Sequence, residues 1–257
     1  DWSSDVCSSD LAWQFRTPVQ VEPYRFTDSA APTQWTTTIE AYQELTANPL
    51  NDISFNPRTM RWEEFFWLHM ITNSYAARIG FVHRCKHDID NSDAEENDSI
   101  LAGYRQKRTL ILGGMAISAV SHPMSFTATS QTLDVVIESR AEYFWYQHDY
   151  RYPAVRYGAS WADLVGGAEA GVNIATDITS NLRCGIRALT LAAFFAASDG
   201  RAASKGLSYL LDGFVSVRGH SGDATIALQF RNMFDHGLRI TADPASFVNV
   251  SITLQGR

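Results

Sequence analysis

The sequence predicts an α+β protein: a mixed, partly helical N-terminal portion packed on a β-rich, mainly antiparallel C-terminal portion with one buried helix. Three observations favour this class. Helix signals gather in residues 12–107, alternating strand patterns dominate residues 108–257, and one long apolar run, Ala188 to Ala197, interrupts those strands. We expect a boundary near residue 107, or one continuous domain formed by both portions.

The first eleven residues are interpreted as an artefact. Their sequence is DWSSDVCSSDL, which is the in-frame translation of a common short-read sequencing adapter at every codon. Segments of this kind are excluded from fold reasoning, as expression tags are. We therefore treat 1–11 as non-native and expect the natural start, with any signal peptide, to be missing.

Composition excludes several classes of protein. Three of the 28 acidic residues, Asp1, Asp5 and Asp10, lie in the adapter segment, which leaves 25 against 21 basic residues and a net charge near −4. A non-specific nucleic-acid binder would carry a basic patch instead. No apolar run approaches the roughly 20 residues of a spanning helix, so no membrane association is expected. Cys85 and Cys184 are too far apart in sequence to indicate a disulfide framework or a zinc ribbon, and no cofactor is predicted.

The N-terminal portion carries three helix signals after an extended start. Residues 17–26 alternate around two prolines, which is typical of an edge strand. Residues 36–45 are predicted to form a short helix. Asn56 suits an N-cap with Pro57 at the first helical position. The apolar side of that helix would carry Trp62, Phe65, Phe66, His69 and Met70. A capping box, Ser92 to Glu95, opens the third helix, which is expected to extend to about Gln106.

The C-terminal portion alternates as strands do. Strands are predicted at 109–120, 124–129, 133–139, 142–152, 214–218, 224–231, 238–242 and 247–254. Gly166-Gly167 predicts a loop, and Ser180 is expected to cap the buried helix, which extends to residue 197. Gly219 to Gly222 predicts a hairpin turn rather than a serine nucleophile. In the last strand apolar and polar residues alternate, which indicates a half-buried strand.

No catalytic motif emerges, so we expect a non-enzymatic structural subunit that assembles with copies of itself, such as a viral coat or tail component. The aromatic-rich, lysine-poor composition resembles that of protein interfaces. The run 143–152 is the expected interface, because alternation on a strand would place five of its side chains on one face. They are Phe144, Tyr146, His148, Tyr150 and Tyr152.

The alternative is a carbohydrate-binding or carbohydrate-active protein that uses this aromatic face as a platform. Glu138 and Glu142 would then supply the two carboxyl groups that glycoside hydrolysis needs. A metal held by His83, Cys85 and His87, which share a face of a strand, is the other source of chemistry considered. Solvated polar residues at the end of an element are the competing interpretation of both sets.

Overall fold

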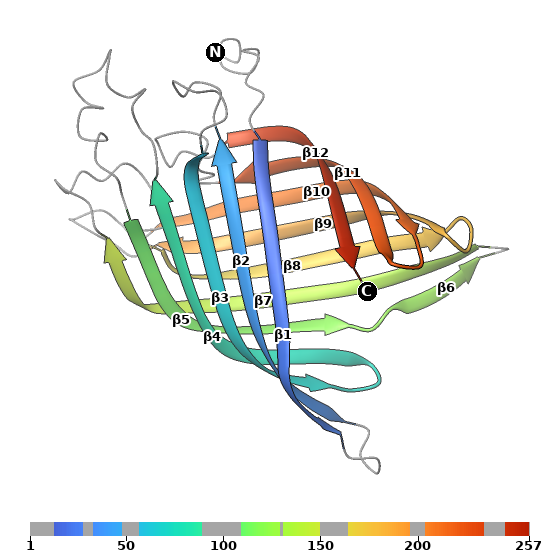
Figure 1. Ribbon diagram of the computed structural model, residues 1–257, viewed down its shortest axis with the longest axis horizontal. Helices are drawn as coiled ribbons and strands as arrows, with labels where there is room; N and C mark the ends of the chain where they lie inside the picture. Colours follow the sequence, from blue (N-terminus) through green and yellow to red (C-terminus); the bar gives the residue numbers. More distant parts are fainter. Residues whose placement is uncertain are drawn as a thin grey trace, which may run out of the picture.

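The computed structural model describes residues 13–27, 33–47, 57–88, 109–128, 131–149, 164–195, 204–233 and 245–256. Within these ranges the chain forms twelve β-strands (Figure 1). The strands are β1 (Trp13–Thr27), β2 (Gln34–Ala47), β3 (Pro57–Ile71), β4 (Tyr75–Asp88), β5 (Thr109–Ser121), β6 (Met124–Ala128), β7 (Gln131–Asp149), β8 (Leu164–Asp177), β9 (Leu182–Phe195), β10 (Ser204–Arg218), β11 (Gly222–Met233) and β12 (Ala245–Gly256).

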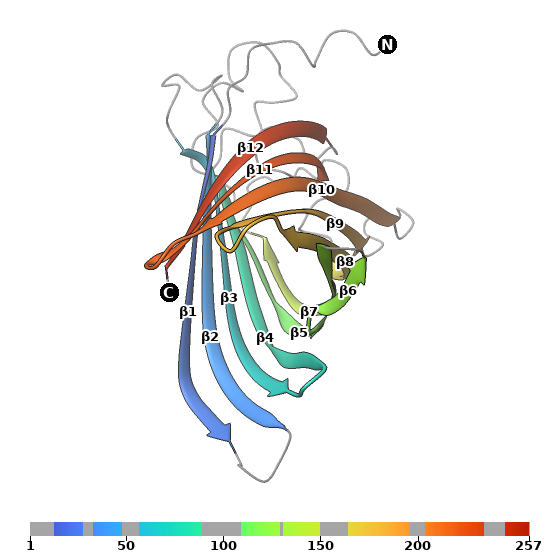
Figure 2. The same cartoon turned by 90° about the vertical axis from the view of Figure 1, so that its right-hand side faces the viewer.

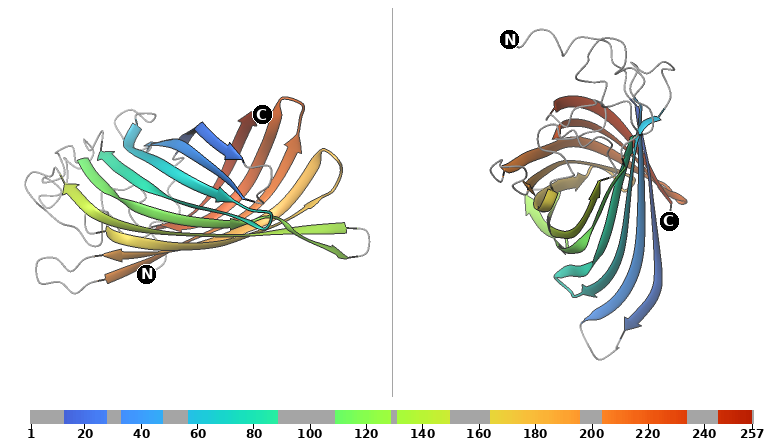
Figure 3. Two further views of the ribbon diagram at one scale, coloured as in Figure 1. Left: turned by 90° about the horizontal axis from the view of Figure 1, so that it is seen from below. Right: turned by 90° about the vertical axis from the view of Figure 1, so that its left-hand side faces the viewer.

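All twelve strands belong to one antiparallel sheet. Neighbours in the sheet are neighbours in sequence, except that β5 pairs with β7 and the short β6 pairs with the first residues of β7. The long strands twist and curl together, so that the sheet forms a deep trough with β1 and β12 as its two edges (Figures 2 and 3). The trough has an inner face, which carries the buried side chains, and an outer face.

Short turns join the strands at one end of the sheet, which we call the turn end. Between β3 and β4 the Thr72 hydroxyl accepts hydrogen bonds from the backbone of Ser74 and Tyr75, at 3.3 and 3.2 Å. Between β10 and β11 the Gly219 N–H donates to the carbonyl of Gly222 at 2.8 Å. Gly222 has a φ of 154°, which residues with a side chain rarely adopt. The turn-end connections are residues 28–33, 72–74, 129–130, 178–181 and 219–221.

The opposite end of the sheet, which we call the loop end, has longer connections. These are residues 48–56, 89–108, 150–163, 196–203 and 234–244. The two ends of the sheet therefore differ in the length of chain they carry.

A modest apolar cluster lies on the inner face. Phe65 and Trp67 of β3 are at its centre, with their rings stacked at 5.1 Å and 10°. Trp67 is fully buried. The other members are Val82, Leu110, Leu112, Ala116, Phe144, Leu164, Ala193 and Phe195. Charged side chains occupy much of the remaining inner face, as described below.

The predicted α+β class is wrong. The described residues contain no helix, and the segments predicted as helices at 36–45, after Asn56 and at 180–197 lie in β2, β3 and β9. The helix predicted from the capping box at Ser92 to about Gln106 lies outside the described residues. In β3 the inner face carries Arg61, Glu63, Phe65 and Trp67 and the outer face Trp62, Glu64, Phe66 and Leu68. Because both faces hold aromatic side chains, the period of two was hidden and a helical spacing was read instead.

Most of the predicted strands are confirmed. The edge segment 17–26, the hairpin turn after Arg218 and most of the strands predicted in the second half occur where expected. The segments 133–139 and 142–149, predicted as separate strands, form the single strand β7, and 238–242 and 150–152 lie outside the described residues. Gly166-Gly167 is not a loop, since it lies inside β8. In the last strand the apolar side is the exposed side, unlike in a protein with a water-facing surface. Val248, Val250, Ile252 and Leu254 are 65–78% exposed, whereas Asn249 and Ser251 are partly covered.

Candidate functional site

The inner face holds a network of buried charges, which we call the inner charge network: Glu40, Glu63, Arg78, Arg84, Arg140 and Glu142. Its members come from β2, β3, β4 and β7, and each strand contributes every second side chain to this face because side chains alternate along a strand. The curl of the sheet brings these strands together around one trough (Figure 2).

Arg84 and Glu142 form the centre of the network. The Arg84 Nη2 atom donates to Glu142 Oε2 at 3.0 Å, and Arg84 Nε lies 2.7 Å from Glu63 Oε1. Arg140 Nη2 lies 3.2 Å from the same Glu142 oxygen. Both side chains of the central pair are only 9% exposed. One buried carboxylate therefore contacts two guanidinium groups, and Glu63 supplies the second negative charge that balances them.

Aromatic rings support these cations from below. The Arg84 guanidinium carbon lies 5.3 Å from the centre of the Phe144 ring, and that of Arg140 lies 4.7 Å from the Phe65 ring. These distances are within the range of cation–π interactions, which stabilise a cation that has lost part of its hydration. The apolar cluster thus serves as the platform on which the inner charge network rests.

The second part of the network lies around Trp67. The Trp67 Nε1–H donates to Glu40 Oε2 at 2.9 Å, and Arg78 Nη1 donates to Glu40 Oε1 at 2.7 Å. The Arg78 guanidinium also lies 4.4 Å above the Trp67 ring. Both carboxylate oxygens of Glu40 therefore accept a hydrogen bond, as is usual for carboxylates that are largely covered.

Ion pairs continue along the inner face toward the turn end of β7, β8, β9 and β10. Arg187 Nη2 lies 2.8 Å from Glu138 Oε1, and Arg183 Nη2 lies 2.9 Å from Asp134 Oδ2. Arg218 Nη2 lies 3.1 Å from Asp177 Oδ1. These pairs are more exposed than the central pair, so each contributes less to stability.

Asp134 lies in the β6–β7 hairpin at the turn end. A hydrogen bond from the Ser125 hydroxyl, at 2.7 Å, is the main cause that holds the pKa of Asp134 below its usual range, and the Arg183 guanidinium lowers that pKa further. The carboxylate is thereby kept in its charged form.

The outer face has the opposite character. Among the described residues, 36 large hydrophobic side chains are exposed, whereas only 13 hydrophobic residues are buried. The exposed set includes outward side chains on almost every long strand, such as Ile39, Leu68, Ile79, Ile117, Ile137, Ile186, Leu211, Ile226, Leu228 and Ile252. A monomeric protein in water rarely exposes a continuous apolar surface of this extent. We call this surface the apolar belt.

Aromatic and polar side chains border the apolar belt. Trp35 and Tyr75 lie on the outer face at the turn end. At the loop end, Tyr143 and Trp145 lie with their ring centres 6.3 Å apart. The same border includes a polar contact between His83 and Glu64, whose Nδ1 and Oε2 atoms are 3.1 Å apart. The other oxygen of Glu64 accepts the Trp62 indole N–H at 2.9 Å.

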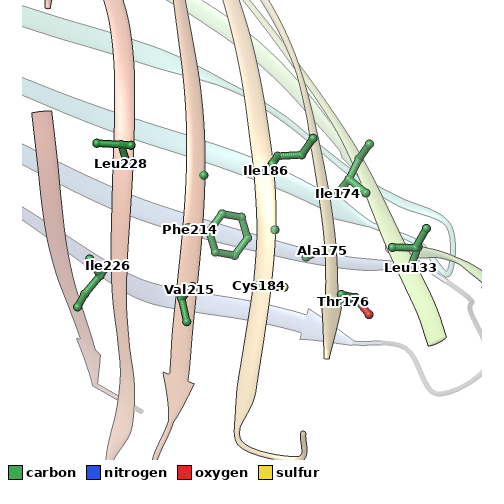
Figure 4. A pocket seen from close by; sticks show the side chains of 12 residues that line it. Leu133, Ile174, Ala175, Thr176, Cys184, Ile186, Phe214, Val215, Ile226 and Leu228 are labelled. Atoms are coloured by element: carbon green, nitrogen blue, oxygen red, sulfur yellow. The ribbon is translucent and has the colours of Figure 1, made fainter. Parts of the chain in front are cut away.

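A shallow apolar groove crosses the sheet between β8 and β11. Its volume is about 700 Å³, and Gly213 leaves space between the outward side chains of Ile186 and Leu228 (Figure 4). Thr176 and Cys184 supply the polar atoms among its described lining side chains, and no charged group lines it. The groove therefore lacks the groups that would orient a polar substrate.

The structure separates the predicted aromatic face. Phe144 is buried on the inner face and Tyr146 is half exposed, because the register between β5 and β7 shifts at Gly113 and Gly114. The side chain of His148 and all of Tyr150 and Tyr152 lie outside the described residues. The predicted carboxylates Glu138 and Glu142 both lie on the inner face, and each is bound to an arginine.

Two of the three predicted metal ligands lie together. The His87 Nε2 and Cys85 Sγ atoms are 3.2 Å apart, whereas His83 pairs with Glu64. In the part of the chain that the structure describes, no group of three or more His, Cys, Asp or Glu side chains is arranged to hold a metal ion.

Sequence reasoning missed the inner charge network. The signal that could have found it is the appearance of charged residues at every second position inside otherwise apolar strands, as in Arg84 and Lys86 of β4 or Glu138, Arg140 and Glu142 of β7. Such a pattern indicates a polar face and an apolar face. It does not indicate which of them is covered.

The described residues contain no helix that is both long and apolar enough to span a membrane. Comparisons with protein-family models, with curated proteins and with solved structures give no match to this chain.

Proposed function

We propose that this protein is a membrane-embedded antiparallel sheet whose charged inner face lines a passage for hydrophilic solutes, as in the channel proteins of outer membranes. The observation that carries the proposal is the inversion of the two faces. Ion pairs fill the inner face, and exposed aliphatic side chains cover the outer face. This is the arrangement expected when the outer face contacts lipid and the inner face contacts water.

The energetics favour a lipid environment for the outer face. Moving one aliphatic side chain such as Leu228 from water into hydrocarbon stabilises the protein by about 1.5–3 kcal/mol. Many such side chains contribute together, because the belt extends from β1 to β12. An antiparallel sheet is suited to lipid because each interior strand satisfies its backbone groups through two neighbours.

The height of the apolar belt approaches the roughly 25 Å apolar band of proteins that cross outer membranes. On β4 the belt lies between Tyr75 at the turn end and His83 at the loop end, with Ile79 and Phe81 between them. Eight steps of about 3.4 Å give roughly 27 Å along the strand, or about 20 Å across the membrane for a strand tilted by about 40°. Aromatic side chains at both borders suit the level of the lipid headgroups. On β7 the corresponding part, by the register through β5, extends from Ile137 to Tyr146.

The two ends of the sheet also fit this assignment. Sheets that cross outer membranes carry short turns on one side and longer loops on the other. Here residues 72–74 and 219–221 form short connections at the turn end, whereas 89–108 and 150–163 form long ones at the loop end. The expected self-association of the chain stays a prediction and is compatible with such a protein.

The test compares two adjacent positions of β11 in the full chain, folded in short-chain phosphatidylcholine vesicles. Leu228→Arg is expected to lower the free energy of unfolding by about 2–4 kcal/mol, because it places a charge in the apolar belt. Gln229→Arg faces the inner side and is expected to change it by less than about 1 kcal/mol. The free energy is measured by urea titration of tryptophan fluorescence.

Lipid dependence separates this proposal from a self-assembling coat subunit. A coat subunit would cover its apolar face with other subunits, so it would reach its β-sheet content in buffer without lipid. A membrane sheet is expected to show the far-ultraviolet circular dichroism of folded strands only with detergent or vesicles. Folding in plain buffer, or equal effects of the two substitutions, would refute the membrane assignment.

A further inference from the structure

The two edge strands of the described sheet run in the same direction. Ten successive antiparallel pairings lead from β1 to β12, and β6 lies off this path. An even number of reversals returns the original direction, so β1 and β12 both run from the loop end to the turn end. Each of the two has one neighbour in the sheet, β2 for β1 and β11 for β12.

Both edges lie within the apolar belt. On β1 the outward side chains Val19 and Val21 are 53% and 54% exposed, and on β12 Val250 and Ile252 are 68% and 71% exposed. If the sheet crosses a membrane, as proposed above, these edges present unpaired backbone groups to hydrocarbon. Each unsatisfied group is costly there, which is why sheets in membranes are closed.

Direct pairing of β1 with β12 is not a favourable way to satisfy the unpaired backbone groups of the two edges. The two strands would form a parallel ladder at the only such position in the described sheet, and parallel pairs are slightly less stable per residue. β12 is also strongly inclined to β1 in the view of Figure 2. Pairing with the edge of a second copy of the chain would also be parallel, because two copies in the same membrane orientation present β12 and β1 in the same direction.

An odd number of inserted strands restores antiparallel pairing at both edges. We infer that the gap between β1 and β12 is filled by an odd number of additional strands that run from the turn end to the loop end next to each edge. Their side chains would alternate between apolar residues facing lipid and polar residues facing the inner charge network. Pro18 of β1 has no backbone N–H, so it cannot donate a hydrogen bond to any neighbouring strand.

The first arm of the test asks whether β1 and β12 pair directly. In a variant of the full chain whose native cysteines are replaced by serine, Val19→Cys and Val250→Cys are introduced together and oxidised in detergent micelles. The inference predicts no disulfide between them. A control pair on directly opposed residues of β11 and β12, Ile226→Cys with Ile252→Cys, is expected to form one.

The second arm supplies a strand of the required direction. β11 runs from the turn end to the loop end, so a copy of Gly222–Met233 is joined ahead of β1 through a copy of the 234–244 connection. The matched control carries the same residues with the apolar and polar positions exchanged. A cysteine introduced into the β11 copy is expected to form a disulfide with Ile252→Cys. The variant is also expected to give an SDS-resistant form whose gel mobility changes on heating. The control is expected to give neither result.

The outcomes are distinct. A Val19–Val250 disulfide within one chain or between two chains overturns the inference, and so does equal behaviour of the β11 copy and its exchanged control. If Leu228→Arg and Gln229→Arg have equal effects in vesicles, the membrane assignment fails, whatever the cysteine pairs show.

Discussion

Arg84 and Glu142 lie 58 positions apart in the sequence, yet the Arg84 Nη2 and Glu142 Oε2 atoms are 3.0 Å apart on the inner face of the sheet. The same carboxylate also binds Arg140 at 3.2 Å. Because both side chains of the central pair are almost fully buried, removing the negative charge leaves two guanidinium groups without their shared counter-ion. The polar interior is therefore expected to be sensitive to substitution at this pair.

Glu142→Gln is expected to lower the free energy of unfolding by about 3–5 kcal/mol, since it breaks a buried ion pair while it keeps the size of the side chain. Urea unfolding of the full chain in vesicles measures the change. Glu138→Gln is the control, because its partner Arg187 is 37% exposed, and it should change stability by less than about 1 kcal/mol. Equal effects of the two substitutions would show that burial of the network is not what stabilises it.

Gly80→Ala is expected to destabilise the protein by about 1–3 kcal/mol. A Cβ atom at Gly80 would clash with the Phe66 carbonyl oxygen and lie 2.9 Å from the Trp67 ring. Gly213→Ala is the matched control, because nothing lies within 4 Å of its added Cβ. That change should be neutral or stabilising by up to about 1 kcal/mol, since it restricts the unfolded chain. Thermal or urea unfolding compares the two, and a reversed order would contradict the register of β4 against β3.

Trp145 and Trp67 should differ in their contact with lipid. Trp145 is 55% exposed on the outer face, whereas Trp67 is fully buried on the inner face. Vesicles of dibrominated phosphatidylcholine quench the fluorescence of indoles that touch the acyl chains. Trp145→Phe is therefore expected to remove more of the quenchable fluorescence than Trp67→Phe. The opposite result would place the inner face against lipid.

Asp134 should contribute to stability in a pH-dependent way. Its pKa is lowered in the folded protein, mainly by the Ser125 hydroxyl and also by Arg183. A carboxyl group of this kind stabilises the folded state above its unfolded pKa of about 3.9, and the contribution is lost as pH falls through the lower folded pKa. Stability should thus decrease more steeply below about pH 4 in the wild type than in Asp134→Asn. Parallel profiles from urea midpoints between pH 6 and pH 2 would contradict this prediction.

The sequence alone determined much of the local structure in the second half of the chain. Strict alternation, as in residues 247–254, predicted strands because successive side chains of a strand point to opposite faces. The glycines at 219 and 222 predicted the hairpin turn, and Pro18 and Pro23 predicted an edge strand. These features depend on the conformational preferences of adjacent residues, so they can be read without knowledge of distant contacts.

The tertiary structure decided which face of each strand is covered. Alternation in β12 distinguishes the Val250 side from the Asn249 side, but either side can face inward, depending on the surrounding solvent. The helix predictions at β3 and β9 were wrong for the same reason: both faces of these strands hold apolar residues, one against the inner cluster and the other in the apolar belt. The Arg84–Glu142 pair was likewise hidden, because only the curl of the whole sheet brings β4 and β7 around one interior.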